Sequence, residues 1–114
     1  MNTQTEKWIV VGHLNDIARR GSRCIKGPRF NIALFRTADD QIYAIEDKCP
    51  HKQGPLSQGI VHDGAVTCPL HNWVINLRTG QVVGEDEGQV RTLPVKLENG
   101  LILLNMGISL VRAA

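Results

Sequence analysis

Residues 49–71 read CPHKQGPLSQGIVHDGAVTCPLH, and this stretch places a cysteine–histidine cluster on either side of a hairpin signal. The first cluster is Cys49-Pro50-His51 and the second is Cys68-Pro69-Leu70-His71, with sixteen residues between His51 and Cys68. Between them, Asp63-Gly64 separates two β-prone segments, and this dipeptide accepts the positive φ values of a type I′ turn. Each cluster follows a predicted strand, so a chain reversal can bring the two loops together at one end of a sheet.

The four cysteine and histidine side chains form a candidate set of metal ligands. Two occupants suit Cys49, His51, Cys68 and His71: a tetrahedral structural Zn²⁺, or a [2Fe–2S] cluster with two cysteines on one iron and two histidines on the other. Zinc fingers usually pair cysteine with cysteine and histidine with histidine along the chain, whereas here each loop contains one of each. This ligand order favours the iron–sulfur cluster over zinc.

Short β-prone segments separated by turn residues continue on both sides of these loops. Ile42 and Ala44 alternate with Tyr43 and Ile45, so we expect them on opposite faces of one strand. No segment carries a sustained helical period, although residues 14–20 could form a single helical turn with Asn15 or Asp16 as its cap. Many short strands at regular spacing predict an all-β fold, an antiparallel sandwich or barrel. The expected strands are 8–11, 22–26, 31–36, 41–46, 60–61, 65–67, 73–75, 81–83, 93–98 and 101–104.

Length, charge and apolar segments narrow the class of protein. The chain has 114 residues, a formal net charge of +2, and 21% charged and 42% hydrophobic residues. This length predicts a single domain over 1–114, and the small net charge argues against a nucleic acid or an anionic membrane as partner. No apolar run follows a basic N-terminus, and the apolar stretch 101–104 is too short to span a bilayer, so we expect a cytoplasmic protein.

The sequence resembles the Rieske proteins over its whole length, and not only at the four candidate ligands. The segments CPLHNWVINLRTG (68–80), GEDEG (84–88) and VRTLPV (90–95) are most similar to the small subunit of the NAD(P)H-dependent assimilatory nitrite reductase. The Rieske ferredoxins of oxygenases share most of this pattern. The resemblance implies an antiparallel β-sandwich with a small subdomain of two loops that binds one [2Fe–2S] cluster, and an electron path through the edge formed by His51 and His71.

One departure from the family pattern indicates the subtype. High-potential Rieske proteins of respiratory complexes carry an extra cysteine in each loop, and these two cysteines form a disulfide. Here the corresponding positions are Gly54 and Leu70. The resemblance is therefore to low-potential Rieske ferredoxins and reductase subunits, and it argues against a quinol-oxidising partner. Histidine ligation makes the oxidised centre neutral, which raises its potential above that of an all-cysteine cluster.

The resemblance implies an electron-transfer subunit of nitrite reductase, the oxidoreductase that reduces nitrite to ammonium in nitrate assimilation. A large catalytic subunit would carry FAD, siroheme and a [4Fe–4S] cluster and would take electrons from NAD(P)H. The sequence shows no dinucleotide fingerprint and no catalytic constellation, so we expect no catalytic site on this chain. The alternatives are a free-standing Rieske ferredoxin of a ring-hydroxylating oxygenase and, in another class, a zinc-stabilised interaction module.

The remaining distinctive residues carry structural expectations. Cys24 is predicted to be a small buried hydrophobic residue, His62 a solvated loop residue, and Trp73 a packing residue rather than part of an electron path. Gly54 and Gly59 are expected to allow close approach of the backbone to the cluster. A basic run is predicted to be a solvated loop or, as the lesser alternative, a docking face for an acidic partner; its residues are Arg19, Arg20, Arg23, Lys26 and Arg29.

Overall fold

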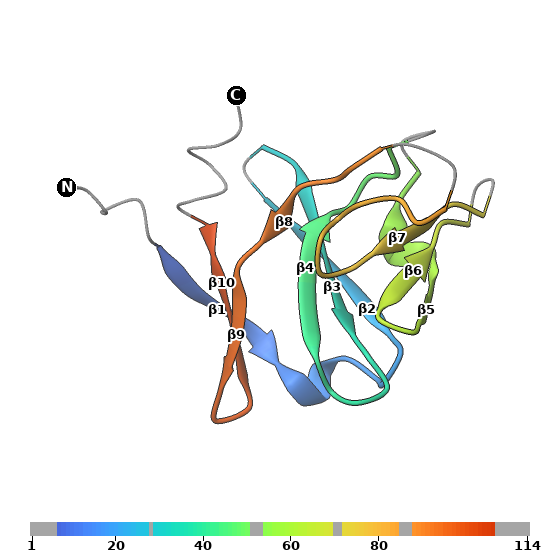
Figure 1. Ribbon diagram of the computed structural model, residues 1–114. Helices are drawn as coiled ribbons and strands as arrows, with labels where there is room; N and C mark the ends of the chain where they lie inside the picture. The colour runs from blue at the N-terminus through green and yellow to red at the C-terminus, as the bar shows by residue number, and fades with distance from the viewer. Residues whose placement is uncertain (1–6, 28, 51–53, 70–71, 85–87, 107–114) are drawn as a thin grey trace.

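The computed structural model describes residues 7–27, 29–50, 54–69, 72–84 and 88–106. These residues form short strands and two single-turn 3₁₀ helices, which confirms the predicted all-β fold (Figure 1). No helix within these ranges is both long enough and apolar enough to cross a membrane. The strands are β1 (Trp8–His13), β2 (Ser22–Lys26), β3 (Asn31–Arg36), β4 (Ile42–Glu46), β5 (Ile60–His62), β6 (Ala65–Thr67), β7 (Val74–Asn76), β8 (Thr92–Leu93), β9 (Val95–Glu98) and β10 (Leu101–Asn105), and the 3₁₀ helices are η2 (Leu14–Asp16) and η3 (Leu56–Gln58).

The strands form three antiparallel sheets that lie beside one another as layers (Figure 1). The outer sheets have the orders β1-β10-β9 and β5-β6-β7, and the central sheet has the order β2-β3-β4-β8. One apolar cluster joins the central sheet to β10, and a second joins it to β5, β6 and β7. Strands β3 and β4 of the central sheet are therefore buried on both faces. This explains why β3, whose residues Ile32–Arg36 are all buried, reads as a continuous apolar run rather than an alternating one.

Strand β4 shows how one strand serves both apolar clusters. Ile42 and Ala44 belong to the cluster on the β10 side, whereas Ile45 belongs to the cluster on the β5-β6-β7 side and Tyr43 packs against it. The predicted division of these four residues between two faces is confirmed. The residues that follow β4 therefore start from a strand that is fixed by packing on both sides.

Two hairpin predictions are confirmed by backbone geometry. Asp63 and Gly64 have φ values of 52° and 72°, and Asn99 and Gly100 have φ values of 53° and 82°. Two successive positive φ values are the requirement of a type I′ turn, which matches the twist of the two flanking strands. These turns set the register Ile60↔Thr67 in the β5–β6 hairpin and Leu101↔Glu98 in the β9–β10 hairpin.

Other local predictions were wrong, each for a physical reason. The helical turn is limited to η2, and its cap is His13, whose Nδ1 accepts the Asn15 N–H, rather than Asn15 or Asp16. The strand expected over 93–98 is divided at Pro94, where the chain passes from the central sheet to the β1-β10-β9 sheet. Proline has no N–H for a ladder, so it marks the point of transfer. The segment 81–83 is not a strand, although Val82 makes an isolated bridge to Ile75.

Candidate metal centre

The two predicted cysteine ligands are brought into one buried region. Cys49 lies three residues beyond the end of β4, and Cys68 directly follows β6. Both side chains are 0% exposed and belong to the same apolar cluster, which also contains Leu56. His51 and His71, the other two predicted ligands, lie outside the described residues, so the complete set of four remains a prediction.

Each cysteine begins a loop that its own backbone amide closes. The Cys49 N–H donates to the Gly54 carbonyl oxygen at 2.8 Å, and the Cys68 N–H donates to the Trp73 carbonyl oxygen at 2.7 Å. Both hydrogen bonds join residues five positions apart in the sequence. The Trp73 ring is partly buried and packs against the apolar cluster that contains both cysteines, so its predicted packing role is confirmed. The two loops thus have the same closure, and each includes one predicted histidine in its sequence.

Asp47 links the first loop to η3, the 3₁₀ helix that follows it, by hydrogen bonds. The two carboxylate oxygens of Asp47 accept hydrogen bonds from the Ser57 N–H and the Ser57 hydroxyl, each at 2.7 Å. The Ser22 hydroxyl in turn donates to the Ser57 carbonyl oxygen, which joins η3 to the edge strand β2. Neither Asp47 nor Ser57 was predicted from the sequence. They lie ten residues apart with no local pattern to connect them, and only a polar pair flanking a candidate ligand loop could have drawn attention to them.

Gly59 lies where the two loops approach each other. A Cβ atom at Gly59 would lie 2.4 Å from the Thr67 carbonyl oxygen and 2.8 Å from Val66 Cγ2. Gly59 ends η3, which follows the first loop, and Thr67 immediately precedes Cys68. Gly59 therefore allows the segments that carry the two loops to approach closely, whereas the approach of Gly54 and Gly59 to the cluster stays a prediction.

His62 and Cys24 do not have the surroundings that the sequence predicts. His62 is the last residue of β5 and is half-buried, with Nε2 at 2.5 Å from Thr67 Oγ1 and Nδ1 at 3.3 Å from Asp63 Oδ2. Cys24 is exposed on the edge strand β2. Partial desolvation, followed by a hydrogen bond with Asp47, raises the pKa of the Cys24 thiol. A raised pKa disfavours the thiolate form of Cys24 at neutral pH.

The donor chemistry of the described residues fits half of a Rieske centre. Two buried sulfur donors in an apolar cluster suit iron–sulfur ligation, which uses thiolates shielded from water. Within the described ranges, no group of three or more histidine, cysteine, aspartate or glutamate side chains is placed to hold a metal ion. The other two expected donors, His51 and His71, lie outside these ranges and stay a prediction.

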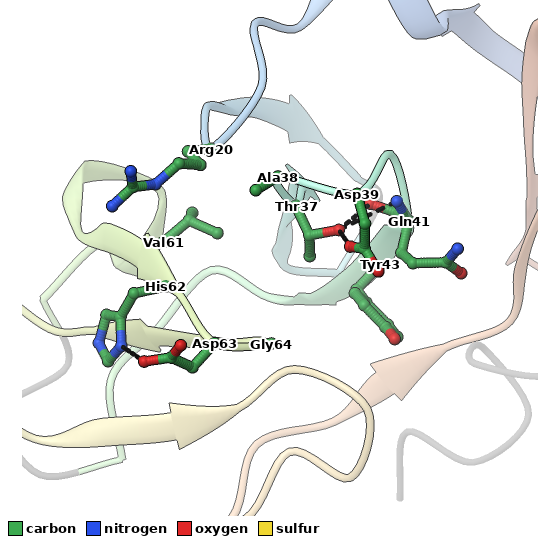
Figure 2. Close-up of a pocket in the computed structure, with 10 residues that line it drawn as sticks. All are labelled: Arg20, Thr37, Ala38, Asp39, Gln41, Tyr43, Val61, His62, Asp63 and Gly64. Carbon is green, nitrogen blue, oxygen red and sulfur yellow. Dashed lines mark hydrogen bonds and ion pairs between the residues drawn. The ribbon is translucent and has the colours of Figure 1, made fainter.

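A surface groove lies away from these loops. It has a volume of about 680 Å³ and is lined by residues of the turn at 37–41 together with His62, Asp63 and Gly64 (Figure 2). Figure 2 shows the His62 ring directed toward Asp63, with Arg20 on the same side of the groove. Because β6 runs from this turn toward Cys68, the groove lies at the end of the β5–β6 hairpin opposite the ligand loop. It is not part of the candidate metal centre.

Comparison with known proteins gives a family match over most of the chain. Residues 7–105 match the family model of the Rieske-like [2Fe-2S] domain. The chain is 39% identical over 102 residues to an anthranilate 1,2-dioxygenase ferredoxin subunit from Burkholderia cepacia, and the match covers 89% of this chain and 94% of that protein. It is also 39% identical over 98 residues to a 4beta-methylsterol monooxygenase from Methylococcus capsulatus.

The extent of each match differs. The match to the sterol monooxygenase covers 75% of this chain but only 27% of the length of that enzyme. Among solved structures, a protein assigned as the small subunit of an NADH-dependent nitrite reductase from Mycobacterium tuberculosis superposes with a TM-score of 0.80. That superposition covers 88% of this chain and 95% of the other at 20% sequence identity, so it shows a shared fold.

Proposed function

We propose, since the chain belongs to the Rieske-like [2Fe–2S] domain family, that Cys49, His51, Cys68 and His71 hold its cluster within a single domain over residues 1–114. The chain is an electron-transfer domain associated with oxidoreductases. When bound, a Rieske-type [2Fe–2S] cluster supplies a one-electron redox couple. The observation that supports these ligands is the burial of Cys49 and Cys68 in one apolar cluster, each at the start of a closed loop.

The expected role of this chain is to position and shield the two cysteine ligands rather than to catalyse a reaction. Complete burial of the two cysteines keeps water from their sulfur atoms, and the closed loops hold them at fixed positions on two packed strands. Removal of water from charged ligands strengthens their interactions with the metal site. The expected role is thus to accept an electron from one protein and deliver it to another, where the substrate is converted.

A ferredoxin role in a ring-hydroxylating oxygenase system is the function that the sequence relationship supports best. The 39% identity to the anthranilate dioxygenase ferredoxin extends over nearly the whole length of both chains. In such a system this chain would carry electrons from an NADH-dependent reductase to a terminal oxygenase. The match to the sterol monooxygenase, in contrast, covers only 27% of that enzyme.

The electron-transfer small subunit of an NAD(P)H-dependent nitrite reductase is the second candidate function. Its support is the similarity of segments 68–80, 84–88 and 90–95 to that subunit and the fold shared with the M. tuberculosis protein. The partner would then be a large catalytic subunit with FAD, siroheme and a [4Fe–4S] cluster. The fold likeness at 20% identity carries less weight than the full-length ferredoxin relationship.

One reconstitution experiment separates the two functions. The cluster-loaded chain is added to a reductase and terminal oxygenase pair, and separately to the large nitrite reductase subunit, all from the organism that encodes the chain. Dependence of NADH-driven ring hydroxylation on the chain supports the ferredoxin role, whereas dependence of NAD(P)H-driven ammonium formation supports the nitrite reductase role. Electron paramagnetic resonance of the reduced chain tests the cofactor: a bound zinc with no iron–sulfur signal would overturn both.

A further inference from the structure

The β5-β6-β7 sheet presents one mostly apolar row on its solvent face, next to the second ligand loop; its one polar member is Thr67, whose hydroxyl is hydrogen-bonded to His62. The register pairs Ile60 with Thr67 and Thr67 with Val74, and the Val83 N–H donates to the Val74 carbonyl oxygen at 2.8 Å. Residues directly opposite each other in antiparallel strands share a face, so these four side chains form one row about 14 Å long, which we name the outer row. Ile60 is 67% exposed and Val83 is 53% exposed.

The apolar character of the outer row is not needed to form the core of this chain. The neighbouring row on the opposite face already supplies the core, because Val61, Val66 and Ile75 are buried and Val82 packs against them. The next row on the solvent face, at His62, Ala65, Asn76 and Gln81, is mostly polar, as expected for a sheet with one wet face. Apart from the small, buried Ala65, the apolar side chains of this face thus lie in the row that borders the ligand loop.

Charged residues are almost absent from the segment that builds this surface. Of the 24 charged residues in the chain, only Asp63 and Arg78 lie within residues 53–84, whereas the average content of 21% would place about seven there. Asp63 lies in the β5–β6 turn and Arg78 follows β7. The Leu77 N–H donates to the Gly64 carbonyl oxygen, so both charges lie at the end of the sheet opposite Cys68.

We propose that the outer row is the docking surface for the redox partner of this chain, and that the partner presents an uncharged apolar patch in front of its own cofactor. This inference rests on the proposed electron-transfer function. Thr67 is bonded to Cys68, and Val74 follows Trp73, whose carbonyl closes the second loop, so a partner on the outer row lies beside the predicted cluster. A neutral patch can be covered without desolvating a charge, and its small size suits the small interfaces of transient electron-transfer complexes.

The test measures steady-state electron transfer to variants with less apolar surface. Ile60→Ser and Val83→Ser shorten the outer row, and Val10→Ser is the matched control because Val10 is 56% exposed on β1, in the sheet on the other side of the molecule. The probes are an NADH-dependent oxygenase reductase and the large nitrite reductase subunit, both from the organism that encodes the chain. Because these positions lie in the proposed interface, we expect each outer-row variant to raise the KM of the partner enzyme for the chain by approximately 5- to 30-fold. The kcat and the electron paramagnetic resonance spectrum of the reduced chain should not change.

The salt dependence of KM distinguishes binding through the outer row from binding through the acidic residues that follow it in the sequence, Glu85, Asp86 and Glu87. The ratio of variant to wild-type KM is expected to be the same at 50 and 500 mM NaCl, because apolar contacts are not screened. If a probe exchanges electrons with the wild type but the Ile60 and Val83 variants keep its KM, the docking assignment is wrong and the proposed function stands. If neither probe exchanges electrons with the wild type, both fail. A change in self-association of the variants, with KM unchanged, would identify the row as a contact between copies of this chain.

Discussion

Substitution of Gly59 by alanine is expected to disturb the candidate metal centre more than the fold. The new Cβ would lie 2.4 Å from the Thr67 carbonyl oxygen, whereas real Cβ contacts essentially never fall below 3.0 Å and are ordinary from 3.4 Å. The backbone must therefore separate by at least 0.6 Å, and by 1.0 Å for an unstrained contact. Thr67 is joined to Cys68 by a peptide bond, so this movement displaces a predicted ligand. Overpacking of this kind costs about 1–3 kcal/mol, or roughly 4–12 °C in melting temperature for a domain of this size.

Two control variants isolate the effect on the ligand loop. A Cβ at Gly80 would lie 2.3 Å from the Val90 carbonyl oxygen, so Gly80→Ala introduces a similar clash away from Thr67, and the positive φ of Gly80, 78°, adds backbone strain that makes it the more severe variant. A Cβ at Gly12 would meet only side-chain atoms of Arg23 and Asp16 at 3.2 Å, so Gly12→Ala is the mild control. We expect Gly59→Ala to lose bound iron and sulfide at a temperature where Gly80→Ala retains them. Full cluster content in Gly59→Ala, or equal loss in Gly80→Ala, would refute the reasoning.

Three further predictions follow from other contacts. Hydrogen bonds to the Asp40 carboxylate, the largest from Arg19, lower its pKa to about 2. Because this folded-state pKa lies below the unfolded value of about 3.9, the stabilisation by the ionised carboxylate is present above pH 4 and is lost toward pH 2. The melting temperature of Asp40→Asn should therefore be lower than that of the wild type at pH 7 but not at pH 2. Cys24→Ser should keep the iron–sulfur absorbance and Cys68→Ser should abolish it, and equal spectra would contradict the ligand assignment. Phe35→Ala should lower the free energy of unfolding in urea by about 3–5 kcal/mol, since its ring is fully buried, and a loss below about 1 kcal/mol would contradict that packing.

The sequence predicted those features that depend on neighbours along the chain. The positive φ values at Asp63 and Gly64 follow from the residue types in the turn, and the two faces of β4 follow from the alternation of Ile42, Tyr43 and their neighbours. The pairing of Cys49 and Cys68 in one buried cluster could also be expected, because a tight hairpin lies between them. These predictions needed no knowledge of the order of strands in the sheets.

The features that the sequence did not predict depend on which strands become neighbours. Cysteine is a residue type that is usually buried, but Cys24 is exposed because β2 is the edge strand of the central sheet. His62 is drawn into β5 because the register pairs it with Ala65. The ion pair between Arg19 and Asp40, 2.9 Å long, joins residues 21 positions apart. No local pattern specifies such contacts, which explains why the basic run from Arg19 to Arg29 was predicted to be a solvated loop or a docking face and the ion pair of Arg19 was not predicted.

The layered arrangement separates what holds the cluster from what recognises a partner. Both cysteine loops start from strands whose inner faces are fixed in one apolar cluster, and the outer row lies on the opposite face of the same β5-β6-β7 sheet. Substitutions in the outer row can therefore change the partner without disturbing the buried cysteines, because alternate residues of a strand point to opposite faces. This gives a physical reason why one fold can occur in an oxygenase ferredoxin and in a nitrite reductase small subunit. With the outer row as the proposed docking surface, we expect the choice between these functions to depend on exposed residues such as Ile60 and Val83 rather than on the ligand motifs.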